Sequence, residues 1–217
     1  MAITIYNGYC SLTELKDWLM PTLSNSDTSG DDRMSIAINA ASRAIDDHCG
    51  RVFFNTSTSG GDTRYATASD ASTLLERDLG IDILSLASLS TDEDGDRTYE
   101  RSWTTGDYDL QPYNAAEAHR PYTRLSVTPD GSYSFPVGVN KGVKLVGVFG
   151  YCTTGGQDQW AGAVKGACLI QASRFYARAV SPMGVAGGGA FGEMQIQGKL
   201  DVDVALMLQP LMRGLVG

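Results

Sequence analysis

Three aspartates at alternate positions, Asp92, Asp94 and Asp96, are the residues of this sequence whose spacing best suits a metal ion. The spacing is that of the first ligands of an EF-hand calcium loop. Such a loop also requires glycine at its sixth position and glutamate at its twelfth, where this chain has Arg97 and Trp103. We therefore expect a solvated hairpin turn here, and neither a metal ion nor a cofactor.

The glycine-rich stretch Gly184–Gly192, GVAGGGAFG, is the second candidate for chemistry. A dinucleotide-binding loop follows a strand and opens a helix, whereas this stretch follows a predicted helix, and the Gly-Lys-Ser/Thr of a P-loop is absent. We expect a loop that becomes ordered against a partner. The residues assigned to that loop are Pro182, Met183, Gly184, Gly187, Gly188 and Gly189.

Nucleophilic and acid–base chemistry has little support in the sequence. The two histidines, His48 and His119, are too few for a zinc site or a histidine-based triad, and no serine lies in a G-x-S-x-G context. We therefore expect no catalytic residues and no enzymatic activity. The four cysteines form no C-x-x-C pair and are expected to be reduced and mostly buried: Cys10, Cys49, Cys152 and Cys168.

The composition is that of a folded protein with an uneven charge. Of 217 residues, 42% are hydrophobic and 19% are charged, and no stretch predicts a membrane span or a signal peptide, so we expect a cytosolic protein. The formal net charge is −8, with 22 acids and 12 bases in residues 1–159 and 3 acids and 5 bases in residues 160–217. Because phosphate binding requires a basic surface, the balance argues against a protein that grips DNA.

The element most clearly predicted is a helix over Ser29–Gly50. Its apolar residues Met34, Ile38 and Ile45, with Ala41 between them, recur at the spacing of one helix face. Ser29 and Asp32 resemble a capping box, and Gly50 is suited to end the helix. The opposite face carries three alanines that permit close approach of a second backbone, so this helix is expected to pack on two sides: Ala37, Ala40 and Ala44.

The remaining elements are predicted by the same signals. Helices are expected over Ser11–Met20, with a Ser11–Glu14 capping box, over Trp160–Val180, and over Val204–Leu208, capped by Asp201 or Asp203. Short strands are expected at Arg51–Phe54, Thr63–Ala66, Ser72–Leu75, Ile83–Leu89, Tyr108–Leu110, Tyr122–Val127, Val143–Phe149 and Glu193–Ile196. The fold class is therefore α+β. A bundle of about four helices (1–51 and 151–217) carries an inserted antiparallel β sandwich or barrel-like region (52–150).

The order of these segments resembles a known family. Tyr9–Leu19, Ala40–Phe54, Val143–Tyr151 and Val164–Gly187 follow one another as in the head–tail connector (adaptor) proteins of long-tailed double-stranded DNA bacteriophages. The resemblance extends weakly to DVDVALMLQP near the end of the chain. It departs from the family in the long insertion and in the triple glycine Gly187–Gly189.

The resemblance implies a structural protein of the virion neck, assembled in the host cytoplasm. It implies a homo-oligomeric ring, typically of twelve copies, that binds the portal protein and the next neck or tail-completion protein, with no membrane contact. Twelve copies at −8 each carry −96 formal charges, so DNA is expected to pass the lumen without sequence-specific binding.

Site residues follow from this implied function as hypotheses. Subunit packing is assigned to Ala37, Ala40, Ala44, Arg174 and Arg178, and portal docking to Leu206, Leu208, Leu211, Met212, Arg213 and Leu215. Deleting residues 205–217 is expected to abolish docking and to leave the subunit folded. Two alternatives stay open: a head-closure or tail-completion ring protein, and a monomeric β-sandwich binding module.

Overall fold

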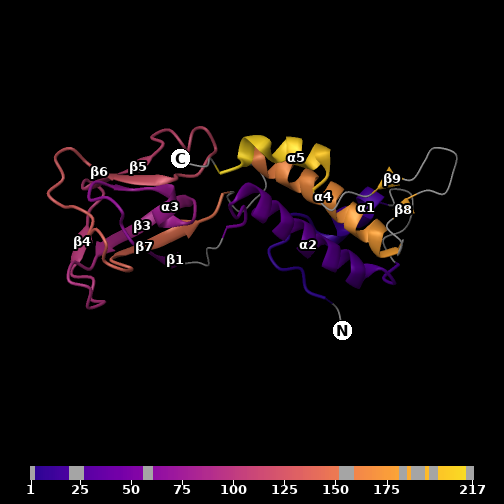
Figure 1. The fold of residues 1–217 in the computed structure, drawn as a ribbon, viewed down its shortest axis with the longest axis horizontal. Coiled ribbons are helices and arrows are strands. Elements are labelled where there is room, and N and C mark those ends of the chain that lie inside the picture. Colours follow the sequence, from indigo (N-terminus) through magenta and orange to yellow (C-terminus); the bar gives the residue numbers. More distant parts are fainter. Residues whose placement is uncertain are drawn as a thin grey trace. The chain divides into compact units, whose positions relative to one another are not determined.

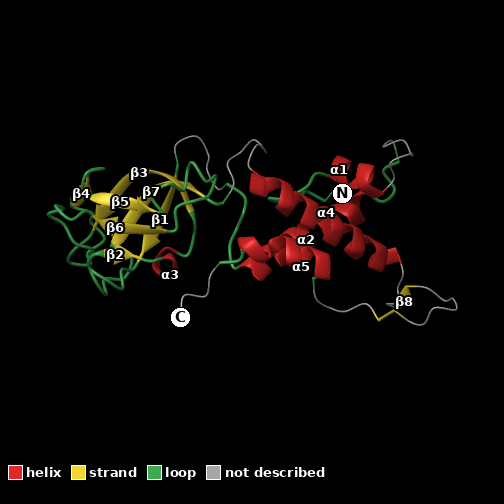
Figure 2. Ribbon diagram, turned by 90° about the horizontal axis from the view of Figure 1, so that it is seen from above, coloured by secondary structure: helices red, strands yellow, loops and turns green. Residues whose placement is uncertain are grey.

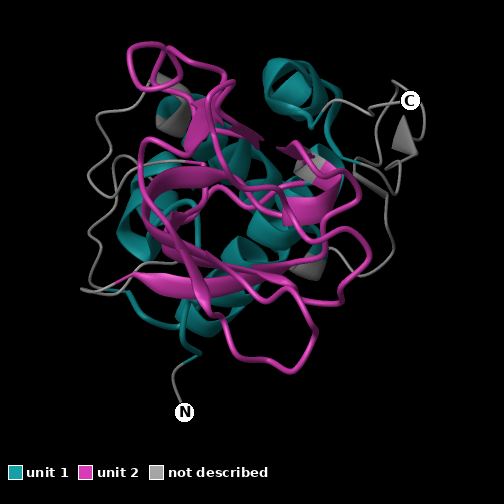
Figure 3. Ribbon diagram, turned by 90° about the vertical axis from the view of Figure 1, so that its left-hand side faces the viewer, with its two compact units in different colours: residues 1–50, 161–217 teal, residues 51–160 magenta. Residues whose placement is uncertain are grey.

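The computed structural model describes residues 3–19, 27–55, 61–151, 159–180, 185–186, 194–195 and 200–213. The chain forms two compact units, residues 1–50 with 161–217 (unit 1) and residues 51–160 (unit 2), which are coloured separately in Figure 3. Unit 1 is helical and unit 2 holds two small antiparallel sheets, neither of which closes into a barrel. The predicted α+β class is confirmed.

Unit 1 is built on α1 (Leu12–Leu19), α2 (Asp31–Cys49), α4 (Gln159–Val180) and α5 (Val202–Leu208), which continues into the 3-10 turn η1 (Gln209–Leu211). The strands β8 (Val185–Ala186) and β9 (Met194–Gln195) pair between α4 and α5. The helices lie against one another in both Figure 1 and Figure 2. The predicted strand Glu193–Ile196 is thus present as β9, whereas β8 was not predicted.

Helix α2 holds unit 1 together as its spacing predicts. Met34, Ile38, Ala41 and Ile45 are all buried. On another side of α2, the N-terminal arm (residues 3–11) runs along the helix without forming a strand, because its backbone N–H groups bond to helix side chains. Ile3 N donates to Asp32, Tyr6 N to Asn39 and Tyr9 N to Ser42, at 2.9–3.1 Å.

The helix ends differ in how well they were predicted. The Ser29–Asp32 capping box is wrong, since the N-cap is Gly30 without a side-chain bond, and Asp32 accepts from the arm instead. Gly50 ends α2 in the left-handed conformation with φ 64°, as predicted. Asp201 caps α5 by accepting from Asp203 N at 2.9 Å. The Ser11–Glu14 capping box is confirmed, with both reciprocal bonds present.

Glu14 also predicts a pH dependence. Its carboxylate accepts from Lys165 Nζ on α4 at 2.7 Å and from Ser11 N at 2.8 Å, and these bonds lower the pKa of Glu14 below its usual range. Since the folded-state pKa is depressed, the resulting stabilisation is present above the ordinary value of about 4.3 and disappears as the pH falls through the folded-state pKa.

We expect Glu14→Gln, which retains a capping amide, to lower the free energy of unfolding by less than about 1 kcal/mol at pH 7, because the pair is partly exposed. The difference from the wild type should vanish near pH 3. Urea denaturation between pH 3 and pH 7 measures it, with Glu117→Gln as an exposed control. A difference that is constant across this range would contradict the prediction.

Unit 2 contains a four-stranded sheet in the order β1-β7-β3-β4 and a three-stranded sheet in the order β2-β6-β5. All named pairs are antiparallel. The first sheet comprises β1 (Asp62–Ala66), β3 (Ile83–Thr91), β4 (Arg101–Trp103) and β7 (Val143–Phe149), and the second β2 (Thr73–Leu74), β5 (Tyr108–Gln111) and β6 (Arg124–Val127); α3 (Glu76–Leu79) is a single turn.

The core of unit 2 contains side chains from both sheets. Leu74 and Leu125 of the second sheet share it with Leu145 and Phe149 of β7 and with Trp103, which stacks on Phe135 with ring centroids 4.7 Å apart. Strict alternation of burial along β7 agrees with its predicted pattern. Residues 51–54 are not a strand, which corrects the prediction. Phe53 is buried, and its ring packs edge-on against that of Tyr151, with centroids 5.2 Å apart.

Candidate interaction surface

An apolar groove of about 880 Å³ lies within unit 1 between the C-terminal half of α2, the middle of α4, and α5. We call it the α5 groove. Its lining is mainly aliphatic and aromatic, with polar side chains contributed by α2, α4 and η1. The lining residues are Ala44, Asp47, His48, Gln171, Phe175, Leu200, Val202, Ala205, Leu206, Gln209 and Met212.

The walls of the groove are fixed by contacts on the far side of α5. Val204, Leu208 and Leu211 are buried in the unit. Before α5, Asp201 pairs with Arg174 of α4, and its backbone N donates to Gln171 Oε1 at 3.1 Å. After η1, Arg213 N donates to the carbonyl oxygen of Cys49, the last residue of α2, at 2.8 Å. Helix α5 is therefore held at both ends.

The outward side of α5 is apolar and exposed. Val202 and Leu206, four residues apart and so on one face, are 66% and 62% exposed, and Met212 beyond η1 is 44% exposed. Large aliphatic side chains gathered at the edge of an apolar groove are typical of protein–protein contact sites. We call Val202, Leu206 and Met212 the groove rim.

The structure divides the predicted docking residues into two sets. Leu206 and Met212 are exposed at the rim, whereas Leu208 and Leu211 are buried in the subunit core. Arg213 is partly buried next to the end of α2, and Leu215 lies outside the described residues. Deleting residues 205–217 would remove core side chains, so point substitutions at the rim are the appropriate test of docking.

The residues assigned to subunit packing are also separated. Ala37 is buried within unit 1, Ala40 is exposed, and Ala44 lies in the α5 groove. Arg174 is paired with Asp201, and Arg178 is half-buried. The structure therefore brings Ala44 together with Leu206 and Met212. The predicted loop residues Pro182, Met183, Gly184, Gly187, Gly188 and Gly189 lie outside the described residues.

Several groove residues were missed from the sequence. Phe175, Val202 and Ala205 were assigned no role in an interaction surface. The available signal was the spacing of Val202, Leu206 and Gln209, which places all three on one side of a short helix. Their exposure depends on which side of α5 meets α4, and a helix with apolar residues on both sides does not specify this.

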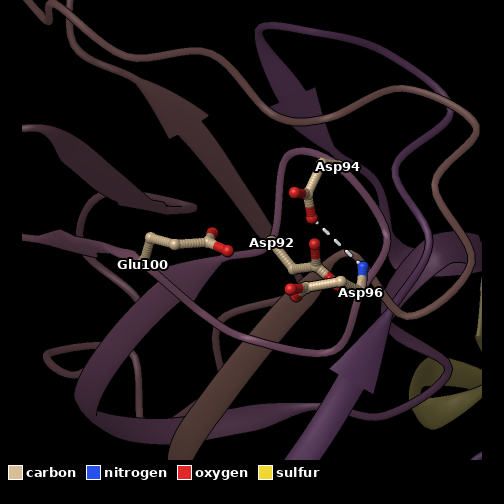
Figure 4. Close-up of side chains that lie close together, drawn as sticks. All are labelled: Asp92, Asp94, Asp96 and Glu100. Carbon is tan, nitrogen blue, oxygen red and sulfur yellow. Dashed lines mark hydrogen bonds between the residues drawn. The ribbon is translucent and has the colours of Figure 1, made fainter.

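The acidic loop between β3 and β4 contains four described carboxylates that lie close together. One oxygen each from Asp92, Asp94, Asp96 and Glu100 lie within 4.8 Å of one another (Figure 4). Burial raises the pKa of Asp92, but hydrogen bonds from Gly95 N and Arg97 N, at 2.7 and 2.9 Å, outweigh this effect and leave its pKa lowered. These bonds close the loop on itself, and the absence of a metal ion remains a prediction.

No helix among the described residues is long and apolar enough to cross a membrane.

The fold of this chain is similar to that of two solved structures, although its sequence matches no known family. No family model and no curated protein matches the sequence. A chain from the neck of an empty gene transfer agent particle, computed with C6 symmetry, matches with a TM-score of 0.54 and 17% identity, covering 100% of this chain and 96% of that chain. A chain from the virion of a native gene transfer agent particle matches with a TM-score of 0.54 and 16% identity, covering 99% and 96%. At this identity the likeness establishes a shared fold over the whole chain.

Proposed function

We propose that this protein is a structural component of the neck of a phage-like particle, an adaptor that forms a ring below the portal and joins the DNA-filled head to the neck or tail. The single observation that carries the proposal is the fold match over the full chain to a protein in a particle neck. The match covers both units. If only the helical unit were shared, the match would cover only part of the chain. We assign the protein no catalytic activity.

A closed ring agrees with the symmetry of the matching neck and with the negative net charge of this chain. The matching neck was computed with C6 symmetry, and a ring of either six or twelve copies is compatible with six-fold symmetry. Twelve copies carry −96 formal charges. A negatively charged lumen would repel DNA and let it slide, whereas a basic lumen would hold it.

The α5 groove is the surface we assign to the portal protein. Its rim offers exposed aliphatic side chains on a helix whose position is fixed by buried contacts, so docking needs little reorganisation. Arg174 of α4, one of the five basic residues in 160–217, is already paired with Asp201. The apolar rim, more than positive charge, therefore supplies the docking contact. Another side of the ring binds the next neck or tail-completion protein.

The proposal predicts the oligomeric state. Native mass spectrometry of the purified protein, alone and mixed with portal protein, should show a closed ring of six or twelve copies, with a central hole in negative-stain images. A protein that stays monomeric under both conditions would contradict the proposal and favour a monomeric β-sandwich binding module.

Sedimentation with the portal distinguishes the two kinds of ring protein. An adaptor binds the portal directly and should sediment with it when no other neck protein is present. A head-closure or tail-completion protein would form a ring but sediment with the portal only after the adaptor is added.

A further inference from the structure

Two cysteines far apart in the sequence meet inside unit 1. Cys10 lies at the end of the N-terminal arm and Cys168 on α4, 158 residues further on, and their Sγ atoms are 3.4 Å apart. Both side chains are buried, at 5% and 0% exposure. Because a disulfide bond is about 2.0 Å long, the two sulfur atoms need to approach by only about 1.4 Å to form one.

The two thiols are chemically distinct. The hydrogen bond from Cys10 lowers the pKa of Cys168, and the same bond, together with burial, raises the pKa of Cys10. Ser42 Oγ on α2 lies a further 3.5 Å from Cys168 Sγ. Since a thiolate is the attacking species in disulfide formation, Cys168 is the sulfur that attacks in the bond-forming step, and Cys10 is the sulfur that it attacks.

Cys10 is the cysteine of the pair that lies on the solvent side. A surface depression of about 450 Å³ is lined by arm and α1 residues, among them Cys10 and its neighbours Tyr9 and Ser11. Cys10 therefore lies between solvent and the fully buried Cys168. A third buried cysteine, Cys49, ends α2 and does not line this depression.

We infer that Cys10 and Cys168 are a disulfide-forming pair that covalently fixes the N-terminal arm to α4 in oxidising surroundings and releases it in reducing ones. This inference is independent of the proposed function. The arm is otherwise held by hydrogen bonds to α2 side chains, several of them exposed, so a covalent link changes its freedom more than that of any helix. Cytosolic glutathione keeps such a pair reduced, and an oxidising exterior closes it.

The reaction can be written with diamide, a diazenedicarboxamide, as the oxidant. Cys10, which lines the depression, loses its proton, and its sulfur adds to one nitrogen of the N=N bond, giving a sulfenylhydrazine. The Cys168 thiolate then attacks the Cys10 sulfur, the S–S bond forms, and the S–N bond breaks. The two thiol protons end on the two nitrogens, so the cysteines are oxidised by two electrons and diamide is reduced to the hydrazine.

The test uses the folded full-length protein treated with diamide, alkylated and digested with trypsin. The linked product joins residues 1–16 to residues 166–174, and mass spectrometry should find it as a species two hydrogens lighter than the sum of the two peptides. Oxidation should raise the melting temperature of the protein by about 5 °C or more, because the bond closes a long loop in the unfolded chain. Dithiothreitol should reverse both changes.

Two variants and one control make the test specific. Cys10→Ser and Cys168→Ala should each eliminate the linked peptide and the rise in melting temperature, and Cys49→Ala, a matched change at another buried cysteine, should preserve both. Circular dichroism verifies that each variant is folded, and the measurement on the wild type stands without them. The inference is overturned if the linked peptide is absent while diamide oxidises glutathione in the same tube, or if it forms only in urea.

Discussion

Replacing Leu206 and Met212 together by aspartate is expected to abolish docking to the portal protein while the subunit remains folded and still forms its ring. Both side chains are exposed at the groove rim, at 62% and 44%, so the unbound protein gains two charges at little cost in stability. In the docked state these carboxylates would be buried against apolar surface without partners. Contact residues at the centre of an interface contribute about 2 kcal/mol or more each, so affinity should fall by at least about 100-fold.

Co-sedimentation with the portal measures docking, and native mass spectrometry measures the ring. Ile36→Asp is the matched control, because Ile36 is 52% exposed on α2 and does not line the α5 groove. Leu208→Asp should instead unfold unit 1, since Leu208 is fully buried one turn from Val204. Docking of unchanged affinity by the double variant would exclude the groove as the portal contact, even if the ring itself is present.

Replacing Gly147 by alanine is expected to destabilise unit 2 by about 3 kcal/mol, a large effect for one methyl group. Gly147 lies in β7, which is paired on both sides, and faces Leu86 of β3 and Asp62 of β1. A Cβ at this position would overlap the carbonyl oxygen of Ser85 and lie 3.1 Å from the Cα of Leu86. Both are backbone atoms held in a sheet, where the register between β3 and β7 already shifts, so no side-chain rotation relieves the overlap.

Urea denaturation followed by circular dichroism measures the decrease in the free energy of unfolding. Hydrogen exchange shows whether the decrease arises in β3 and β7. Gly106→Ala is the matched control, because the nearest atom to a Cβ there is Thr104 Oγ1 at 3.8 Å, an ordinary contact, and Gly106 does not have positive φ. We expect that variant to change the free energy of unfolding by less than about 0.5 kcal/mol. Equal unfolding midpoints for Gly147→Ala and the wild type would contradict the prediction. They would show that β3 and β7 can move apart to accommodate the Cβ without lowering the free energy of unfolding.

The sequence alone determined the elements whose signals are local. The four longer helices were predicted within a few residues, because apolar spacing, the Ser11–Glu14 capping box and Gly50 all act within a few turns of one chain segment. The same holds for β7, whose alternation is continuous over seven residues. Where the signal was weak or shared, prediction failed. Strand β4 has only three residues, and the segment predicted as a strand at 51–54 is not a strand in the structure.

Tertiary structure decided everything that joins distant segments. Helix α5 has apolar residues on both sides, and only its anchoring by Asp201 and Arg213 determines that Leu208 is buried and Leu206 is exposed. The approach of Cys10 to Cys168 likewise depends on the arm running along α2 and on α4 returning to it after a 158-residue separation. The apolar spacing within one segment does not predict which distant segment it will contact. They arise when the apolar faces of elements far apart in the chain are buried against one another, and the exposed surface is what that packing leaves uncovered.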